Sequence, residues 1–181
     1  MTNKLIIGVG GAGTNIAHFL VESLNDNSEL LLINSDKASL DKHSTLNRIF
    51  LDLTLSSETT KPKKITDIVS SVKGEILRYT HNKAHLVIVV GLGGETGSYS
   101  ASSIVNIVNN DLNNVILIAV LPFHFESSRR HLAEQELSKL TSLSNIKIIS
   151  FDNELLMNNK KMGLTEAFEK ANKAILSTIL N

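Results

Sequence analysis

Short apolar segments alternate along this chain with stretches of helical periodicity, and this alternation constrains the fold more than any other feature. The apolar segments are almost continuously hydrophobic, which is typical of strands buried on both faces of a sheet. A strict succession of strands and helices predicts an α/β fold of three layers, a Rossmann-like parallel sheet flanked by helices on both faces. The predicted strands are Leu5–Val9, Leu30–Ile33, Leu86–Val90, Val115–Val120 and Ile146–Ile149, with a weaker one at Arg48–Leu53.

Amphipathic patterns fill the intervals between these strands, with apolar residues recurring at helical spacing. The segment Thr54–Lys64 is rich in Ser, Thr and Lys and contains Pro62, so we predict a loop there. Its lysines, Lys61, Lys63 and Lys64, are interpreted as solvated side chains. The predicted helices are Asn15–Leu24, Ile65–Tyr79, Ser100–Val108, Arg129–Leu143 and Thr165–Leu180.

The composition indicates a globular domain without cysteine chemistry and without a metal site built from histidines. With 181 residues, 42% of them hydrophobic, the chain is long enough to bury a core, so we treat residues 1–181 as a single domain. Lys+Arg equals Asp+Glu at 18 each, which gives no reason to expect nucleic acid as a partner. Cysteine is absent, which excludes disulfides, cysteine-ligated zinc and thiol catalysis. The histidines lack ligand spacing, so we predict no metal site built from them.

No segment has the pattern of a membrane span or a targeting signal. The longest apolar runs, Leu86–Val90 and Val115–Leu121, are too short to cross a bilayer. The first residues run straight into a predicted strand, without a signal-peptide pattern. These features predict a cytoplasmic protein with no membrane segment.

A glycine-rich loop follows the first predicted strand. The run Gly8-Val9-Gly10-Gly11-Ala12-Gly13 precedes a helix opened by Thr14 and Asn15, which matches G-x-G-x-x-G between a strand and a helix. Glycines let the backbone approach a ligand closely, and the free N–H groups at a helix start attract phosphate. Taken alone, the motif also fits a simple tight turn between strand and helix.

A second glycine-rich loop, Gly91-Leu92-Gly93-Gly94-Glu95-Thr96-Gly97-Ser98, follows Leu86–Val90 and also precedes a helix. Both loops would lie at the carboxyl edge of one parallel sheet, where open α/β sheets bind ligands. A dinucleotide-binding Rossmann domain needs only the first loop, and a P-loop NTPase needs a lysine that follows neither loop here. The pair of loops therefore predicts a nucleotide site whose phosphates are held by backbone amides and hydroxyls.

A third loop, after Val115–Val120, carries Glu126 and Arg130. A carboxylate at the end of a strand can accept hydrogen bonds from ribose hydroxyls, and Arg130 can reach a phosphate or pair with Glu126. For either residue alone, an ordinary surface ion pair is the competing interpretation.

Together these segments resemble the GTP-binding domain of the FtsZ/tubulin superfamily, in order and at the right spacing over nearly the whole chain. Ile7–Asn15 resembles its first nucleotide loop, and Gly91–Ser98 resembles its GGGTG[ST] signature. Further segments that resemble FtsZ are Ile33–Leu40, Pro122–Glu126 with Arg130, Asp152–Leu156 and the final helix.

The resemblance implies GTP or GDP as ligand and allows Mg²⁺ to accompany GTP. It implies that Asn15 and Asn172 contact the guanine base, that Phe168 packs on it, and that Glu126 and Arg130 engage the sugar and nearby groups. Without the resemblance, Phe168 reads as a core residue and Asn172 as a solvated one. The residues that it implies around the phosphates are Gly10, Gly11, Gly13, Gly93, Gly94, Thr96, Gly97 and Ser98.

Three features depart from the family pattern. Glu95 stands where the signature has its third glycine, and its carboxylate is expected either to repel the phosphates or to help hold Mg²⁺. We favour repulsion, so that Glu95→Gly tightens nucleotide binding. Leu55–Thr60 lacks the glycine pattern of the loop that senses the γ-phosphate. The chain stops at Asn181, inside what would be the central helix, so the second domain with its acidic synergy loop is expected to be absent.

Three functions remain open from the sequence. The leading hypothesis is an FtsZ-like guanine-nucleotide-binding module of the cytoskeleton or of cell division, which does not activate hydrolysis by itself and docks on a filament or a protein partner. The second is a GTPase active only in a mixed assembly whose partner supplies the acidic loop. The third is a structural pseudo-GTPase with an empty pocket. No catalytic residue is assigned in this chain.

Overall fold

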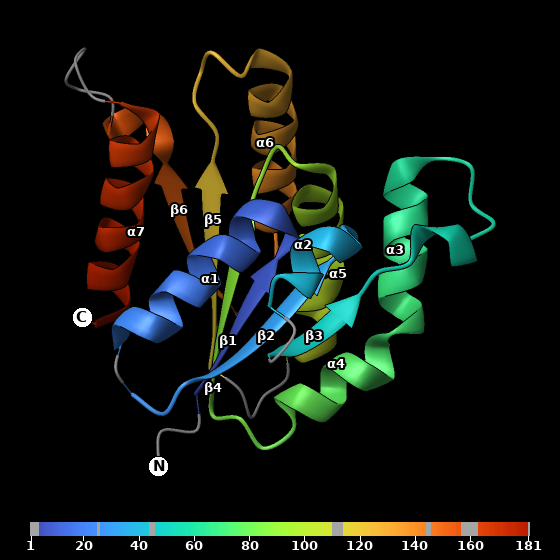
Figure 1. Ribbon diagram of the computed structural model, residues 1–181. Helices are drawn as coiled ribbons and strands as arrows, with labels where there is room; N and C mark the ends of the chain where they lie inside the picture. The colour runs from blue at the N-terminus through green and yellow to red at the C-terminus, as the bar shows by residue number, and fades with distance from the viewer. Residues whose placement is uncertain are drawn as a thin grey trace.

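One parallel sheet organises the molecule. A computed structural model describes residues 4–24, 26–43, 46–109, 114–143, 146–156 and 163–180. The strands within these ranges form a six-stranded sheet with the order β3-β2-β1-β4-β5-β6, and every neighbouring pair is parallel (Figure 1). All the strands predicted from the apolar segments are therefore confirmed, with ends that differ by a few residues. They are β1 Lys4–Val9, β2 Glu29–Asn34, β3 Asn47–Phe50, β4 His85–Gly91, β5 Asn114–Leu121 and β6 Lys147–Asp152.

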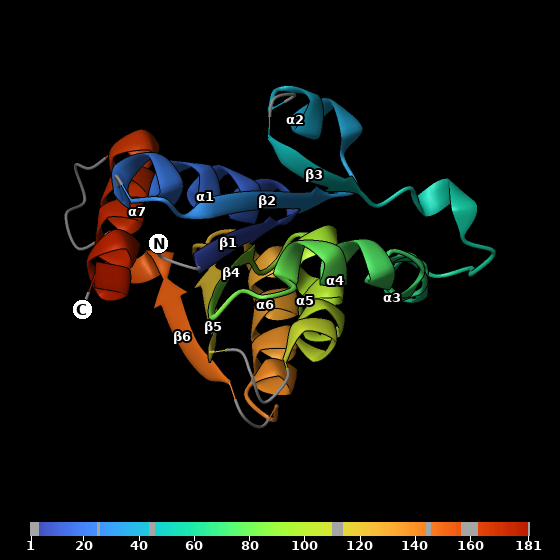
Figure 2. The same cartoon turned by 90° about the horizontal axis from the view of Figure 1, so that it is seen from below.

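Helices cover both faces of this sheet, as the alternating pattern predicts (Figure 2). One face carries α1 Gly10–Leu24, α2 Lys37–Asp41 and α7 Leu164–Leu180. The other carries α3 Lys61–Ser71, α4 Lys73–Thr80, α5 Glu95–Val108 and α6 Ser127–Leu140. Two short 3₁₀ turns complete the described elements, η1 Leu53–Leu55 and η2 Asn153–Leu156.

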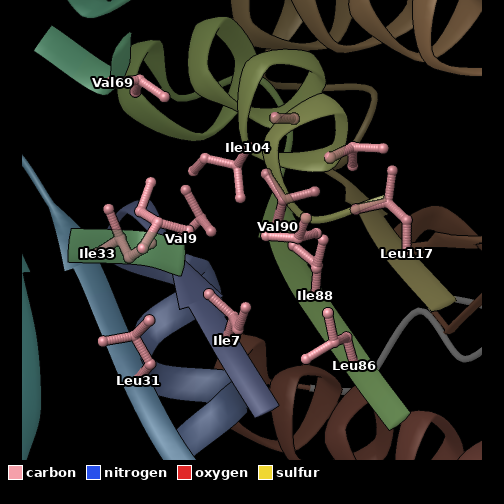
Figure 3. Close-up of a cluster of buried hydrophobic side chains, with 14 of the residues drawn as sticks. Ile7, Val9, Leu31, Ile33, Val69, Leu86, Ile88, Val90, Ile104 and Leu117 are labelled. Atoms are coloured by element: carbon pink, nitrogen blue, oxygen red, sulfur yellow. The ribbon is translucent and has the colours of Figure 1, made fainter. Parts of the chain in front are cut away.

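The strands are buried on both faces because successive side chains point to opposite helical layers. In Figure 3, Ile88 and Val90 of β4 lie on the same side of the sheet as Ile104 of α5 and Val69 of α3. Their neighbour Val89 packs into the opposite cluster, with α1 and α7. Each central strand thus stabilises two hydrophobic cores, which explains its continuous apolar sequence.

Because the strands are parallel, the carboxyl ends of the central strands lie side by side at one edge of the sheet. The chain winds outward from β1 to β3 and then crosses back to β4, so the helices that follow β1 and β4 leave toward opposite faces. Val9 pairs with Val90 across β1 and β4, and Gly91 pairs with Val120 across β4 and β5. The loops after these strands therefore start level with one another, at the switch point where such sheets bind ligands.

The segment between β3 and β4 differs from the prediction. The predicted loop Thr54–Lys64 contains the turn η1, and α3 already begins at Lys61. Pro62 lies in the first turn of α3, where a missing N–H costs no hydrogen bond. The predicted helix Ile65–Tyr79 is two helices, because the backbone leaves helical geometry at Val72 (φ −95°, ψ 9°).

Further differences concern the helix starts, and α5 begins at Glu95, within the second glycine loop, rather than at Ser100. The first helix begins at Gly10 rather than at Asn15, so the glycine loop is itself the first turn of α1. No helix among the described residues is long and apolar enough to cross a membrane. Met1–Asn3, on which the prediction about targeting signals partly rests, lie outside the described residues.

Candidate functional site

The first glycine loop makes a sharp turn between β1 and α1. Gly10 opens α1 at a φ of +71°, a left-handed conformation that glycine adopts without a steric penalty. A Cβ at Gly10 would lie 2.9 Å from the backbone N of Gly97, so the two glycine loops are in direct contact. Gly13 serves packing, since a Cβ there would lie 2.4 Å from the carbonyl oxygen of Val89 on β4. The turn therefore sets the start of α1 against the second loop.

The second glycine loop is held by its own side chains. Gly93 has a φ of +90°, and its N–H donates to the Oγ of buried Ser98 over 2.8 Å. The Oγ1 of Thr96 lies 2.5 Å from the Oγ of Ser35, which links this loop to the segment after β2. Gly94 precedes α5, whose first turn follows at once. The helix start at α5 thus faces the same edge of the sheet as that of α1.

A cavity of about 220 Å³ opens between these loops and the segment after β5. Its walls include the first turns of α1 and α5, where free N–H groups and the helix dipole attract anions. The predicted phosphate residues that line it are Gly11, Gly94, Thr96 and Gly97, and Glu95 lines it as well. Four predicted residues do not line the cavity and instead support the loops through packing and hydrogen bonds: Gly10, Gly13, Gly93 and Ser98.

A second cavity, of about 410 Å³, adjoins the first. All three residues predicted to meet the base, Asn15, Phe168 and Asn172, line it. The two cavities share four lining residues: Ala12, Val120, Asn153 and Phe168. The cavity thus brings Asn15 of α1 next to Phe168 and Asn172 of α7, three residues that the resemblance assigns to the base.

Phe168 is not a core residue, although its position on the apolar face of the last helix suggested that it would be buried. Its side chain is 49% exposed and meets Phe123 edge to face, with ring centroids 5.7 Å apart. Phe123 is buried and stacks on Phe125 at 5.3 Å. One aromatic ring therefore remains free to stack on a planar ligand at the junction of the two cavities.

Asn153 is a site residue that the sequence analysis missed. It follows β6 in the turn η2, is 6% exposed, and lines both cavities. Its Oδ1 is buried and has no hydrogen-bond partner. Leaving a buried acceptor unpaired costs roughly 1–3 kcal/mol, which a ligand donor would recover. The signal was present in the sequence, because Asn153 follows a strand at the same sheet edge as the other three loops.

Arg130 does not pair with Glu126, which was one of the two roles that the sequence left open for Arg130. Glu126 pairs with Arg129, whose Nη1 lies 2.8 Å from Oε2, and both residues line the first cavity. Arg130 instead binds both carboxylate oxygens of Asp152 and does not line either cavity. These hydrogen bonds hold the pKa of Asp152 below its ordinary value and raise the pKa of Arg130. The two oxygens of Glu126 already accept from the N–H of Phe123 and from Arg129. Asp152, by contrast, meets the fork of Arg130 with two parallel bonds.

Glu95 forms an ion pair that the sequence did not reveal, while its predicted repulsion of the phosphates stays a prediction. Its Oε2 lies 2.6 Å from the Nζ of Lys61, a residue that the sequence suggested was merely solvated. Each of the two side chains is 56% exposed. A salt bridge this exposed is screened by water, so it changes local charge more than stability. In the described part of the chain, no group of three or more His, Cys, Asp or Glu could hold a metal.

Comparison with known proteins identifies the family. The profile of the "Tubulin/FtsZ family, GTPase domain" matches residues 3–161. The chain belongs to the tubulin/FtsZ family. It is 25% identical over 182 residues to cell division protein FtsZ 2 of Methanocaldococcus jannaschii, and the match covers 97% of this chain and 47% of the relative. It is 26% identical over 170 residues to mitochondrial division protein fszB of Dictyostelium discoideum, covering 90% and 46%.

Solved structures show the same tubulin/FtsZ fold. An empty FtsZ dimer from M. jannaschii superposes with a TM-score of 0.83 at 23% identity, covering 99% of this chain and 53% of that one. CetZ from Methanosaeta thermophila gives 0.80 at 19% identity, with the same coverage. The chain spans about half the length of the curated relatives it matches. The predicted family and fold class are thereby confirmed.

Proposed function

We propose that this tubulin/FtsZ domain binds a guanine nucleotide, GDP or GTP, across the two joined cavities. The phosphates lie between the glycine loops, where the first turns of α1 and α5 supply N–H donors. The base lies in the second cavity, on Phe168 and beside the amides of Asn15 and Asn172. The observation that carries the proposal is the shared wall of the cavities, because one elongated ligand can fill both.

The choice of guanine rests on the polar groups of the base cavity. Guanine carries an amino donor at N2 that adenine lacks, together with acceptors at O6 and N7. Three amides line this cavity, Asn15, Asn153 and Asn172, and an amide can both donate and accept. The unpaired Oδ1 of Asn153 is suited to accept from such a donor. Lys173, exposed on α7, does not line the cavity and takes no part in base reading.

The sugar and the metal ion complete the proposed ligand. Glu126 and Arg129 line the first cavity, the proposed phosphate cavity, and follow β5, whose Val120 belongs to the shared wall. We therefore assign them, in place of Arg130, to the ribose and its neighbours. Mg²⁺ is proposed to accompany GTP, held chiefly by phosphate oxygens and water, as is usual for this ion. Both carboxylates of the described cavity wall already have cationic partners.

We also propose that residues 1–181 alone hydrolyse GTP slowly. Hydrolysis needs a group that positions and deprotonates a water near the γ-phosphate. Glu95 and Glu126 are the carboxylates that line the phosphate cavity, and each is tied to a cation, Lys61 or Arg129. The positioning group is proposed to come from a protein partner of the same superfamily, in a division-related or other cytoskeletal assembly.

Exposed apolar side chains beside the cleft support docking of such a partner. Phe125, in the loop after β5, is 64% exposed, and Leu155, in the turn after β6, is 70% exposed. Both follow strand ends at the edge that carries the glycine loops. A protein that covers this edge would bury both side chains and enclose the nucleotide at the same time.

Calorimetric titration with GDP, GTP and ATP tests the binding proposal. Guanine nucleotides should bind more tightly than ATP, and Asn15→Ala should weaken guanine binding by about tenfold. The exposed Lys173→Ala serves as the matched control and should bind like wild type. Equal affinity for GTP and ATP would contradict the base assignment, and no binding of any nucleotide would favour a structural pseudo-GTPase.

Phosphate release tests the hydrolysis proposal. The domain alone should release phosphate from GTP at a negligible rate, and a full-length FtsZ added to it should raise that rate above the rate of the FtsZ by itself. Rapid, cooperative release by the domain alone would overturn this part of the proposal while leaving nucleotide binding intact.

A further inference from the structure

An ion pair joins the first residues of two helices at the phosphate end of the cleft. Lys61 opens α3, Glu95 opens α5, and the Nζ of Lys61 lies 2.6 Å from the Oε2 of Glu95. Glu95 lines the phosphate cavity, so the ammonium stands one hydrogen bond away from the cavity wall. The two residues are 34 positions apart in the chain, and the fold alone brings them together.

Packing fixes the positions from which these side chains extend. Ile65, Ile68 and Val69 of α3 are buried in the same cluster as Ile104 and Val105 of α5, and Figure 3 shows Val69 and Ile104 on this side of the sheet. The segment before α3 is also fastened, because the Oγ of Ser56 donates to Asp67 on α3 over 2.5 Å. The backbone at Lys61 is thus held beside the start of α5.

The lining side chains of the cavity carry a net negative charge, which disfavours a polyphosphate unless a cation offsets it. The lining side chains include two carboxylates, Glu95 and Glu126, and one guanidinium, Arg129, a formal charge of −1. Arg129 is paired with Glu126, which leaves Glu95 to be balanced from outside the lining residues. Lys61 provides that balance and brings the wall to neutrality.

We propose that Lys61 binds the terminal phosphate of a nucleoside triphosphate, and that Glu95 positions its ammonium for this contact; the inference rests on the proposed nucleotide site. An ammonium has three N–H donors, and Glu95 accepts one, which leaves two for phosphate oxygens. The base cavity is lined from α1, β5, η2 and α7, with no residue from α3 or α5, so Lys61 lies at the far end of the ligand. This contact would raise the affinity for a nucleoside triphosphate but not for a diphosphate.

Calorimetric titration of Lys61→Met with GDP and with a non-hydrolysable GTP analogue, in excess Mg²⁺, tests this assignment. The affinity for the analogue should fall by about tenfold or more, because a charge-assisted contact is lost, while that for GDP should change by less than about threefold. Lys63→Met, an exposed lysine of the same helical turn, should leave both affinities unchanged. The pair is exposed, so Lys61→Met should fold, and thermal melting checks this. If Lys61→Met does not fold, the affinities of Lys61→Gln for GDP and for the analogue are compared instead, with the same expected result.

A double-mutant cycle tests the positioning role of Glu95. In the wild-type background, Glu95→Gln removes both the positioning contact and a negative charge, so analogue affinity should change by less than about threefold. In the Lys61→Met background the carboxylate is unpaired, so the same substitution should raise analogue affinity by about tenfold. Equal losses for GDP and the analogue, or additive effects in the cycle, would overturn the inference. Failure of the wild type to bind either nucleotide would overturn the proposed function instead.

Discussion

The guanidinium of Arg130 donates one hydrogen bond to each carboxylate oxygen of Asp152, and both bonds are 2.7 Å long. Arg130 also donates to the carbonyl oxygen of Pro122 over 2.9 Å. Asp152 ends β6 and Pro122 follows β5, so this one side chain holds together two strand ends that flank the cleft. Asn153 is the next residue along the chain, so the anchoring of Asp152 also positions Asn153 in the cavity wall.

Arg130→Ala should lower the free energy of unfolding by about 2 kcal/mol, because it leaves a partly buried carboxylate without its partner. Urea titration at pH 7 measures this. Lys170→Ala is the control and removes a pair with Glu166 that is exposed on both sides, so its effect should stay within about 0.5 kcal/mol.

The same pair gives a dependence on acid pH. The hydrogen bonds from Arg130 hold the pKa of Asp152 below its ordinary value. The folded state therefore binds this proton less tightly than the unfolded chain, and the stabilisation is complete above about pH 4, near the unfolded carboxyl pKa. It is lost as the pH falls through the folded pKa, so the stability gap between wild type and Arg130→Ala should narrow at low pH, with the bond from Arg130 to the Pro122 carbonyl as a remainder. A gap that persists undiminished at pH 2 would contradict this account.

The lowered pKa of His43 predicts that stability also depends on pH near neutrality. Its ring lies 4.7 Å from that of His18, and its pKa is lowered by desolvation first and then by the positive charges of His18 and Lys42. Because the folded pKa is depressed, the stabilisation is present above the unfolded pKa of about 6.5 and is lost as the pH falls below it. The melting temperature should decline from pH 7.5 to 5.5, and His43→Gln should make that decline shallower. The exposed His81→Gln should leave the slope as in wild type.

The sequence predicted those features that a local pattern controls. Strands such as β4 are buried on both faces, and this leaves a continuous apolar run that can be recognised without the structure. The two glycine loops were placed correctly because each follows such a strand, and a parallel sheet brings strand ends to one edge. Asn15 and Asn172 were assigned to one cavity through the family resemblance, and the structure brings them together.

Contacts between side chains distant in the chain could not be predicted in this way. Arg130 pairs with Asp152, 22 positions away in the chain, rather than with the nearer Glu126. Lys61 pairs with Glu95, which is 34 positions away. Both choices depend on how strand ends and helix starts are juxtaposed, which residue types and spacing do not reveal. The break at Val72 was missed for a similar reason, because the apolar residues on either side continue a helical stripe.

Gly10→Ala should damage both the fold and the nucleotide site. The φ of +71° costs a residue with a Cβ about 1–2 kcal/mol, and that Cβ would lie 2.9 Å from the backbone N of Gly97. We expect a loss of stability of at least this size by urea titration, together with weaker GDP binding. Gly74→Ala is the matched control, since Gly74 lies within α4 with open space around it, and it should stabilise the protein by about 0.5–1 kcal/mol. Equal stability of the two variants would show that the contact between the loops is not required.

Asn153→Ala should separate ligand binding from folding. The Oδ1 of Asn153 is buried without a partner, so its removal relieves a desolvated acceptor, and the stability of the free protein should change by less than about 1 kcal/mol. If this oxygen accepts a hydrogen bond from the bound base or sugar, GDP affinity should fall by about tenfold. Asn106→Ala, an exposed asparagine on α5, should change neither quantity. Calorimetry for GDP and urea titration of the free protein supply the two measurements. A large loss of stability with unchanged GDP affinity would mean that Asn153 supports the turn after β6 and does not contact the nucleotide.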